Sequence, residues 1–251
     1  MRSGRLAALA SAAVLACAAP ASPVDRDAVA ALFKLFLRDS AELPMDVQVT
    51  TVVTNAKGRE IRRKHTSVRL LFRGYNQRSG NFSLTSNGSF FHMRELHDSL
   101  APDFAIFKAF SLAVPGKDGP PKLEVAEEGP GVVVRAAESD CGAFQMFQGE
   151  LIARRDCSAV EFTVGRDAAG GLAVQRFRLD ARNLPAAANL RYLGACQVRQ
   201  YHAEGDVQQV YLPGDPRPFL APRRVVETIG TDRGTIVVTN EHVLSEPAKK
   251  K

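Results

Sequence analysis

The sequence predicts an α+β protein: a strongly curved antiparallel β-sheet, a half-barrel of roughly ten strands, with an N-terminal helix and a helical insertion packed in its concavity. Three observations predict it. Runs of alternating polar and apolar residues recur along the chain, glycine-containing turns join them, and only two segments have a helical pattern. Two helices can cover the apolar face of so many strands only if the sheet curls around them. A β-sandwich is the alternative.

The composition is that of a globular protein. Of 251 residues, 45% are hydrophobic and 24% are charged, which excludes wholesale disorder. No apolar run approaches the ~20 residues that a membrane-spanning helix needs, which excludes a polytopic helical membrane protein. The net charge of +6 is modest, and we expect no nucleic-acid binding.

Residues 1–21 have the layout of a secretory signal peptide. Arg2 and Arg5 form a short positive region, and an apolar stretch follows from Leu6 to Ala16. The sequence therefore predicts an exported protein of the periplasm or outer membrane.

Two cleavage sites remain open. Val14-Leu15-Ala16-Cys17 resembles the lipobox of bacterial lipoproteins, and cleavage before an acylated Cys17 would leave a lipid anchor in the membrane. Cleavage after Ala21, at Ala19-Pro20-Ala21, would leave no anchor.

The other cysteines are compatible with export. Cys141, Cys157 and Cys196 allow one disulfide in an oxidising compartment, either Cys141–Cys157 or Cys157–Cys196, and three buried thiols are the alternative. No C-x-x-C occurs, so the cysteines do not indicate a zinc ribbon.

The first element after the signal peptide is an amphipathic helix over Val24–Leu43. Leu32, Leu35 and Phe36 recur at helical spacing, and Pro44 is expected to end the helix.

A long hairpin follows, with strands Met45–Thr54 and Arg59–Phe72 around a turn at Asn55–Gly58. On the second strand we expect one buried face, with Thr66, Val68, Leu70 and Phe72, and one solvated face, with Arg63, His65, Ser67 and Arg69. The basic run Arg59–Lys64 is interpreted as a solvated strand face.

Next come a strand over Asn81–Met93 and the helical insertion over Arg94–Val114, which Pro102 splits or restarts. A loop at Gly116–Pro121 follows the insertion. The remaining strands are expected at Leu123–Glu127, Val132–Ala136, Phe144–Ala153, Ala159–Val164, Leu172–Asp180, Arg191–Ala203, Asp206–Leu212, Arg223–Gly230 and Thr235–Leu244, with an extended loop at Pro213–Pro222. Residues 22–244 are expected to form a single domain, and residues 245–251 a disordered basic tail.

No catalytic motif is found, and we expect neither an enzyme nor a cofactor or metal. His92 and His97, with Asp98, miss the spacing that places two ligands on one helical face. His202 and His242 fall on expected strands and are interpreted as exposed.

The order of these elements resembles the LolA/LolB/LppX-like family of periplasmic lipoprotein carriers. The resemblance includes a signal peptide, an amphipathic first helix and Gly-turned hairpins, and it extends to the closing segments Val210–Pro213, Phe219–Glu227 and Gly234–Thr239. It implies a half-barrel that binds acyl chains in an apolar concavity under helices and that is not an enzyme. The three cysteines and the proline-rich loop depart from the family pattern.

We therefore expect a non-enzymatic envelope protein that binds a lipid or another apolar ligand. The candidate pocket residues are apolar positions of the second strand and of the insertion: Val68, Leu70, Phe72, Leu100, Phe104, Phe107 and Phe110. Two alternatives stay open, namely a structural or interaction protein whose core is filled by its own side chains, and a secreted hydrolase with an unrecognised site. The sequence does not identify a protein partner.

Overall fold

A computed structural model describes most of the strands and parts of the helical segments. The described residues are 25–34, 42–76, 81–86, 123–128, 131–136, 144–145, 151–152, 157–167, 170–181, 184, 186–211 and 218–244, together with 102, 103, 105, 106, 109, 110 and 113. The expected signal peptide, the expected tail at 245–251, and His92, His97 and Asp98 lie outside them.

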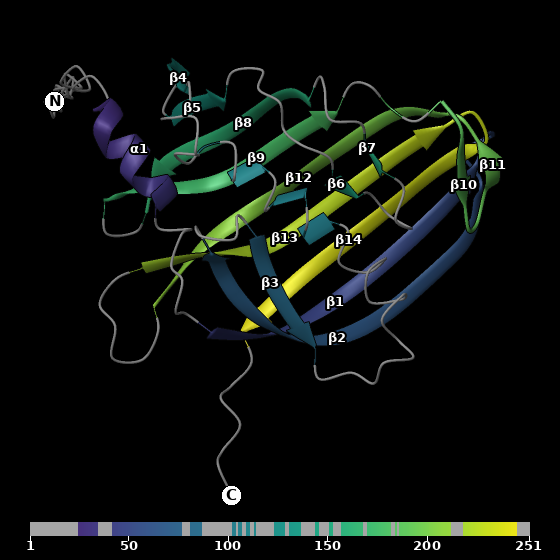
Figure 1. Cartoon of the computed structure of the whole chain (residues 1–251), viewed down its shortest axis with the longest axis horizontal. Coiled ribbons are helices and arrows are strands. Elements are labelled where there is room, and N and C mark those ends of the chain that lie inside the picture. The colour runs from purple at the N-terminus through teal and green to yellow at the C-terminus, as the bar shows by residue number, and fades with distance from the viewer. Residues whose placement is uncertain are drawn as a thin grey trace, which may run out of the picture.

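Ten of the described strands form one antiparallel sheet, in the order β3-β2-β1-β14-β13-β12-β9-β8-β5-β4 (Figure 1). Their bounds are β1 Glu42–Asn55, β2 Glu60–Asn76, β3 Asn81–Ser86, β4 Leu123–Glu128, β5 Gly131–Ala136, β8 Cys157–Arg166, β9 Leu172–Ala181, β12 Val198–Tyr211, β13 Pro218–Thr231 and β14 Gly234–Leu244. Two small two-stranded sheets are β6 Phe144–Gln145 with β7 Leu151–Ile152, and β10 Ala188–Leu190 with β11 Gly194–Cys196. In the described residues β3 and β4 are the free edges, so the sheet is not a closed barrel.

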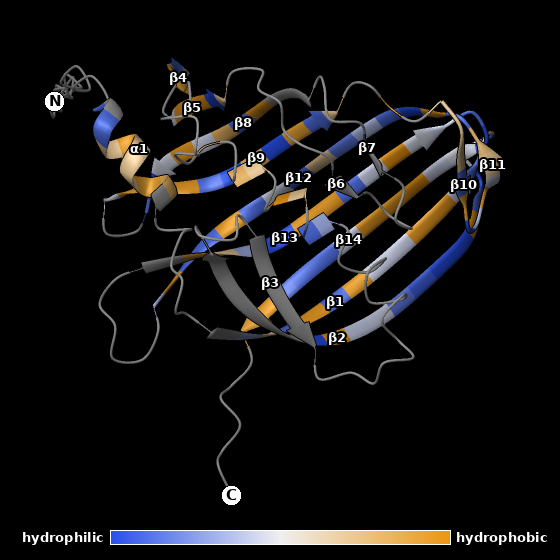
Figure 2. Ribbon diagram, in the orientation of Figure 1, coloured by the Kyte–Doolittle hydropathy of each residue, from blue (hydrophilic) through white to orange (hydrophobic). Residues whose placement is uncertain are grey.

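The sheet has one apolar face and one polar face, as the alternation predicted. We call the buried side the inner face, and Figure 2 shows the alternating apolar and polar bands along its strands. Its buried apolar residues on β1, β8, β9, β12, β13 and β14 include Met45, Val47, Val49, Val53, Val160, Phe162, Val164, Phe177, Leu179, Tyr201, Ala203, Val207, Val225, Ile229, Ile236 and Val238. On β2, Val68 is half-buried whereas His65 and Arg69 are exposed, which agrees with the expected faces for the part of β2 whose side chains are described.

The outer face is held by polar side-chain pairs across neighbouring strands. Arg69 pairs with Asp46 at 2.8 Å, and Arg135 with Glu161 at 3.1 Å. Such exposed pairs contribute little stability each, so the burial of the inner face is the dominant favourable term.

Two helical segments cover the inner face. The first is α1, Arg26–Lys34, which lies against β9. The second, which we call the cover, consists of residues 102, 103, 105, 106, 109, 110 and 113, all buried and helical up to 110. Three rings join the layers: Phe33 of α1, Phe110 of the cover and Phe162 of β8 have centroids 4.8 to 5.9 Å apart. Helical residues, and not a second large sheet, therefore cover the inner face in the described part of the chain.

The N-terminal helix is shorter than expected. The described helix ends at Lys34, and Glu42 and Leu43 already belong to β1. Pro44 does not separate helix from sheet but lies within β1, opposite Leu71 of β2 and beyond the first pair with β14, Met45↔Leu244. A proline is tolerated there because no β14 neighbour needs its missing N–H.

The expected break between two strands near residue 204 is wrong, because β12 runs unbroken through Gly205. A Cβ at Gly205 would lie 2.5 Å from the Arg224 carbonyl oxygen and 2.7 Å from the Phe177 ring. Gly205 therefore marks a close approach between strands, and not a turn.

Three further boundaries differ from expectation. The Arg191–Ala203 segment begins in the turn of the β10–β11 hairpin, and Gly194, with φ of 67°, is the first residue of β11. The Phe144–Ala153 segment is two short paired strands, β6 and β7, instead of one. The second half of the expected loop belongs to β13, which begins at Pro218; the first five residues of β13 pair with β12 alone, where prolines remove no bond to β14.

The crowding at Gly205 gives a test. We expect Gly205→Ala to lower the free energy of unfolding by roughly 2–3 kcal/mol, because a backbone carbonyl and a buried ring must both move. Gly165→Ala is the control, since its Cβ would meet only the flexible end of Gln175, and it should cost under about 1 kcal/mol. Urea unfolding monitored by circular dichroism measures both. Equal losses in the two variants would contradict the close-approach role.

Candidate functional site

A band of polar side chains is buried within the apolar inner face. Its strand members are Tyr201 on β12, Glu227 on β13, Asn240 and His242 on β14, and Thr51 on β1, each less than a tenth exposed. The cover adds Asp103, which is 1% exposed. We call these six residues the polar band. Buried polar groups cost stability unless they are paired, so their contacts define what the band does.

Asp103 joins the cover to β14. Its Oδ1 lies 2.6 Å from Nε2 of His242, and its Oδ2 accepts a 2.6 Å hydrogen bond from Nδ2 of Asn240. Each carboxylate oxygen therefore faces a nitrogen of the sheet. Asn240 and His242 share the inner face because they lie two residues apart on one strand.

The remaining six described residues of the cover have no polar side chain. They are Pro102, Ala105, Ile106, Ala109, Phe110 and Ala113. In the described residues, the side-chain polar contact between cover and sheet is therefore confined to Asp103. We call this contact the Asp103 anchor.

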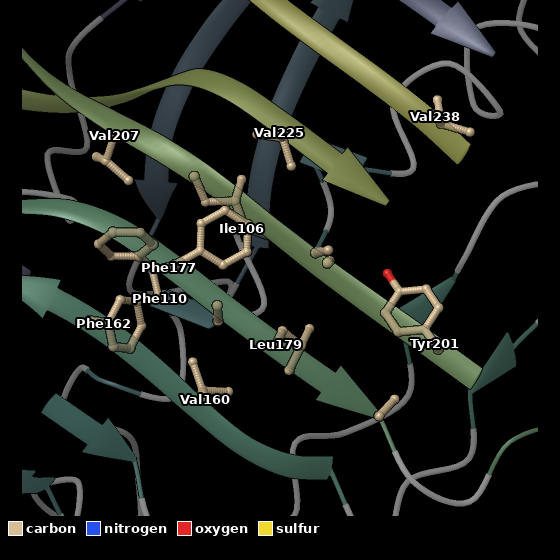
Figure 3. Packing of buried hydrophobic residues seen from close by; sticks show 14 of the residues in the cluster. Ile106, Phe110, Val160, Phe162, Phe177, Leu179, Tyr201, Val207, Val225 and Val238 are labelled. Carbon is tan, nitrogen blue, oxygen red and sulfur yellow. The ribbon is translucent and has the colours of Figure 1, made fainter. Parts of the chain in front are cut away.

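A second polar pair lies on the next two strands beyond β14, with Glu227 on β13 and Tyr201 on β12. Tyr201 is opposite Ile229, and Glu227 is opposite Ala203 and Val238, so the two side chains are diagonal neighbours on the inner face. Burial raises the pKa of Tyr201 well above its ordinary value, and the charge of Glu227 and a hydrogen bond to it raise that pKa further. Figure 3 shows the Tyr201 ring among the buried apolar side chains near the end of its strand.

The candidate pocket residues are only partly brought together. Val68 packs half-buried against the core, and Phe110 is fully buried between Phe33 and Phe162. Leu70 and Phe72 lie on β2, although their side chains are outside the described set. Leu100, Phe104 and Phe107, and the lipidation candidate Cys17, also lie outside it.

Cys196 is a buried free thiol on β11, so the Cys157–Cys196 option is not formed, whereas the Cys141–Cys157 option lies outside the described residues. Burial raises the pKa of Cys196, which keeps the thiol protonated and inert. Cys196 lies opposite Ala188 in a small sheet, whereas Cys157 lies opposite Ala181 in the large one, so no strand pairing joins them. Cys141 and the side chain of Cys157 lie outside the described residues.

The two histidines expected on strands have different surroundings. His202 is on the outer face, 18% exposed, with its Nδ1 2.7 Å from Asp180 and its Nε2 3.6 Å from Glu204. His242 is buried, which corrects the expectation that it is exposed. Its position follows from alternation along β14, since it continues the inward series Ile236, Val238 and Asn240. That parity was a usable signal, but nothing in the sequence linked His242 to Asp103.

No group of three or more residues able to hold a metal ion occurs among the described side chains. Nor does the described part contain a helix with the length and apolar character to cross a membrane. Comparisons with family models, with curated proteins and with solved structures find no match.

The raised pKa of Tyr201 predicts how stability responds to alkali. Unfolded tyrosine has a pKa of about 10, so the unfolded chain loses the Tyr201 proton before the folded chain does. The free energy of unfolding is therefore unaffected at lower pH and falls as the pH rises through the unfolded pKa toward the folded pKa. We therefore expect the urea midpoint to fall between about pH 9.5 and 11. Tyr201→Phe should reduce this fall, and Tyr211→Phe, at a 59% exposed position, should not. Identical pH profiles for the three proteins would contradict the assignment.

Proposed function

We propose that this chain is an exported, non-enzymatic protein that binds a lipid or another apolar ligand between the inner face and the cover. The Asp103 anchor is the observation that carries the proposal. The cover rests on the sheet through apolar side chains and one buried polar contact. A segment held in this way can lift when that contact breaks, and lifting it uncovers an apolar surface that an acyl chain would bury again.

We also propose that the antiparallel sheet is a half-barrel that resembles those of the LolA/LolB/LppX-like family. Two features support it. The sheet has ten strands with one apolar face, and both described helical segments lie on that face. Half-buried Val68 lies beside the part of the inner face where β1 and β2 meet, so this side is the natural entrance for a ligand.

A second candidate is a structural or interaction protein with a self-filled core. One observation favours it: Phe33, Phe110 and Phe162 form a closed ring cluster between the helical segments and the sheet, and all three are at most 1% exposed. Interiors packed in this way leave no room for a ligand unless they open. The two candidates therefore differ in whether the cover moves.

Probe uptake distinguishes them. A dansyl-labelled undecanoic acid should bind the full chain with about one site per molecule and with enhanced fluorescence. Asp103→Asn keeps the side-chain volume but replaces one carboxylate oxygen with an amide nitrogen. Because this change alters the contacts with His242 and Asn240 that hold the cover on the sheet, it should speed uptake about ten-fold.

Asp46→Asn is the matched control, because Asp46 pairs with Arg69 on the outer face of the sheet. Its uptake rate should equal that of the wild type. Absence of probe binding in all three folded proteins would overturn ligand binding and favour the self-filled core. Binding at equal rates would overturn the role of the anchor.

We also propose that the protein is anchored at Cys17 after export. The chain purified from its own membrane fraction should have a mass that fits an acylated N-terminal Cys17, and lipid extraction should release any bound ligand. In Cys17→Ser the protein should leave the membrane fraction, since each buried CH₂ of the acyl chains contributes about 0.8 kcal/mol to membrane binding. A wild-type chain that begins at Ser22 would refute the anchor.

A further inference from the structure

Basic side chains from four parts of the sequence meet at one end of the sheet. They are Lys57, Arg59 and Arg62 of the β1–β2 hairpin, Arg191 of the β10–β11 turn, Arg199 at the start of β12, and Arg233 of the β13–β14 turn, all exposed. We call them the basic tip. Figure 1 shows the β10–β11 hairpin beside the ends of β1, β2 and β14, at the end of the sheet far from α1.

Contacts between the turns fix the tip. Asn55 of β1 is opposite Gly234 of β14, which places their two hairpin turns side by side. The guanidinium carbon of Arg62 lies 4.8 Å from the Tyr192 ring centroid, which joins β2 to the β10–β11 turn. Asp232 and Gln197 exchange two hydrogen bonds, from the Gln197 N–H to Oδ1 of Asp232 at 2.8 Å and from the Asp232 N–H to the Gln197 carbonyl at 3.1 Å.

The tip has few compensating carboxylates. Among the described residues of these turns, the acids are Glu60 and Asp232. Glu60 pairs with the neighbouring Arg63, and hydrogen bonding to Arg63 lowers the pKa of Glu60. Both side chains are charged, and the pair has no net charge. Asp232 is engaged by the Gln197 N–H. Among the described residues of the tip, cations therefore outnumber carboxylates.

An apolar side chain lies among these cations. Ile61 is 51% exposed between Glu60 and Arg62, and Tyr192 is half-buried beneath Arg62. Exposed cations interspersed with an exposed aliphatic side chain and an amphipathic aromatic ring suit the headgroup region of a bilayer, where phosphates meet the first methylenes. Nucleic acid would be matched instead by exposed aromatic rings for stacking, which the described tip does not present.

We propose that the basic tip is a docking surface for an anionic phospholipid membrane, with Arg59, Arg62 and Arg233 contacting lipid phosphates and Ile61 entering the interface. This surface is separate from the inner face and does not depend on ligand binding there. The basic tip lies at the end of the sheet away from α1, so it is a surface distinct from an N-terminal lipid anchor.

Vesicle binding tests the charges. All proteins carry Cys17→Ser, so that acylation does not contribute. This parent should bind vesicles of phosphatidylglycerol and phosphatidylcholine more tightly than pure phosphatidylcholine, and salt should weaken the binding. The triple variant Arg59→Gln, Arg62→Gln, Arg233→Gln should bind about 100-fold more weakly, since each basic residue near an anionic surface contributes roughly five-fold.

The matched control changes net charge equally on the outer face, with Arg176→Gln, Arg178→Gln and Arg224→Gln, whose side chains are 52–61% exposed. It should bind as the parent does, and circular dichroism should show that both triple variants are folded. If both triple variants bound vesicles equally weakly, net charge alone would explain the binding, and the basic tip would not be the docking surface. Tip-dependent binding to duplex DNA without binding to vesicles would overturn a membrane as the partner.

Fluorescence tests Ile61 by itself. The chain contains no Trp, so Ile61→Trp introduces a single reporter. Its emission should shift to the blue when anionic vesicles are added. Val243→Trp is the control, because Val243 is 60% exposed at the opposite end of the sheet, opposite Asp46. A blue shift at Val243 and none at Ile61 would overturn the proposed orientation.

Discussion

The structure depends on one constraint, which is that a ten-stranded antiparallel sheet with a single apolar face must have that face covered. Each central strand places alternate side chains inward, and those side chains are nearly all Val, Ile, Leu, Phe or Ala. Transfer of such surface from water is the largest favourable term in folding. The positions of α1 and of the cover follow from this requirement, and the ring cluster of Phe33, Phe110 and Phe162 is where the three layers meet.

The polar band interrupts the apolar inner face. A buried carboxylate such as that of Asp103 is costly unless donors replace its water, and Asn240 and His242 provide nitrogens on both of its oxygens. Apolar side chains of similar volume could have packed there without that cost. The polar contact restricts where the cover can sit on the sheet, because apolar surfaces can slide past one another whereas a paired carboxylate has one favourable position. The anchor thus fixes the register of the described cover residues on the sheet.

Several features could be predicted from the sequence because they arise from local chemistry. The β1–β2 hairpin follows from alternating residues around Asn55 and Gly58, whose φ of 75° suits glycine. Other predictions were wrong for physical reasons that the structure shows. The sequence predicts separate strands that end at Ala203 and restart at Asp206, but β12 continues through Gly205, where the Phe177 ring and the Arg224 carbonyl require a residue without Cβ. Pro218 and Pro222 were assigned to a loop because prolines exclude a central strand, whereas that part of β13 has one neighbour only.

By itself the sequence determined the alternation of most strands and the turn between β1 and β2, since alternation and turn preference act over a few residues. Only the tertiary structure decided that β14 would pair with β1, that Asp103 would meet His242, and that cations from residues 57 to 233 would gather at one end of the sheet. Those contacts join residues more than a hundred positions apart. They depend on the order in which strands assemble around the covered face, which no local pattern encodes.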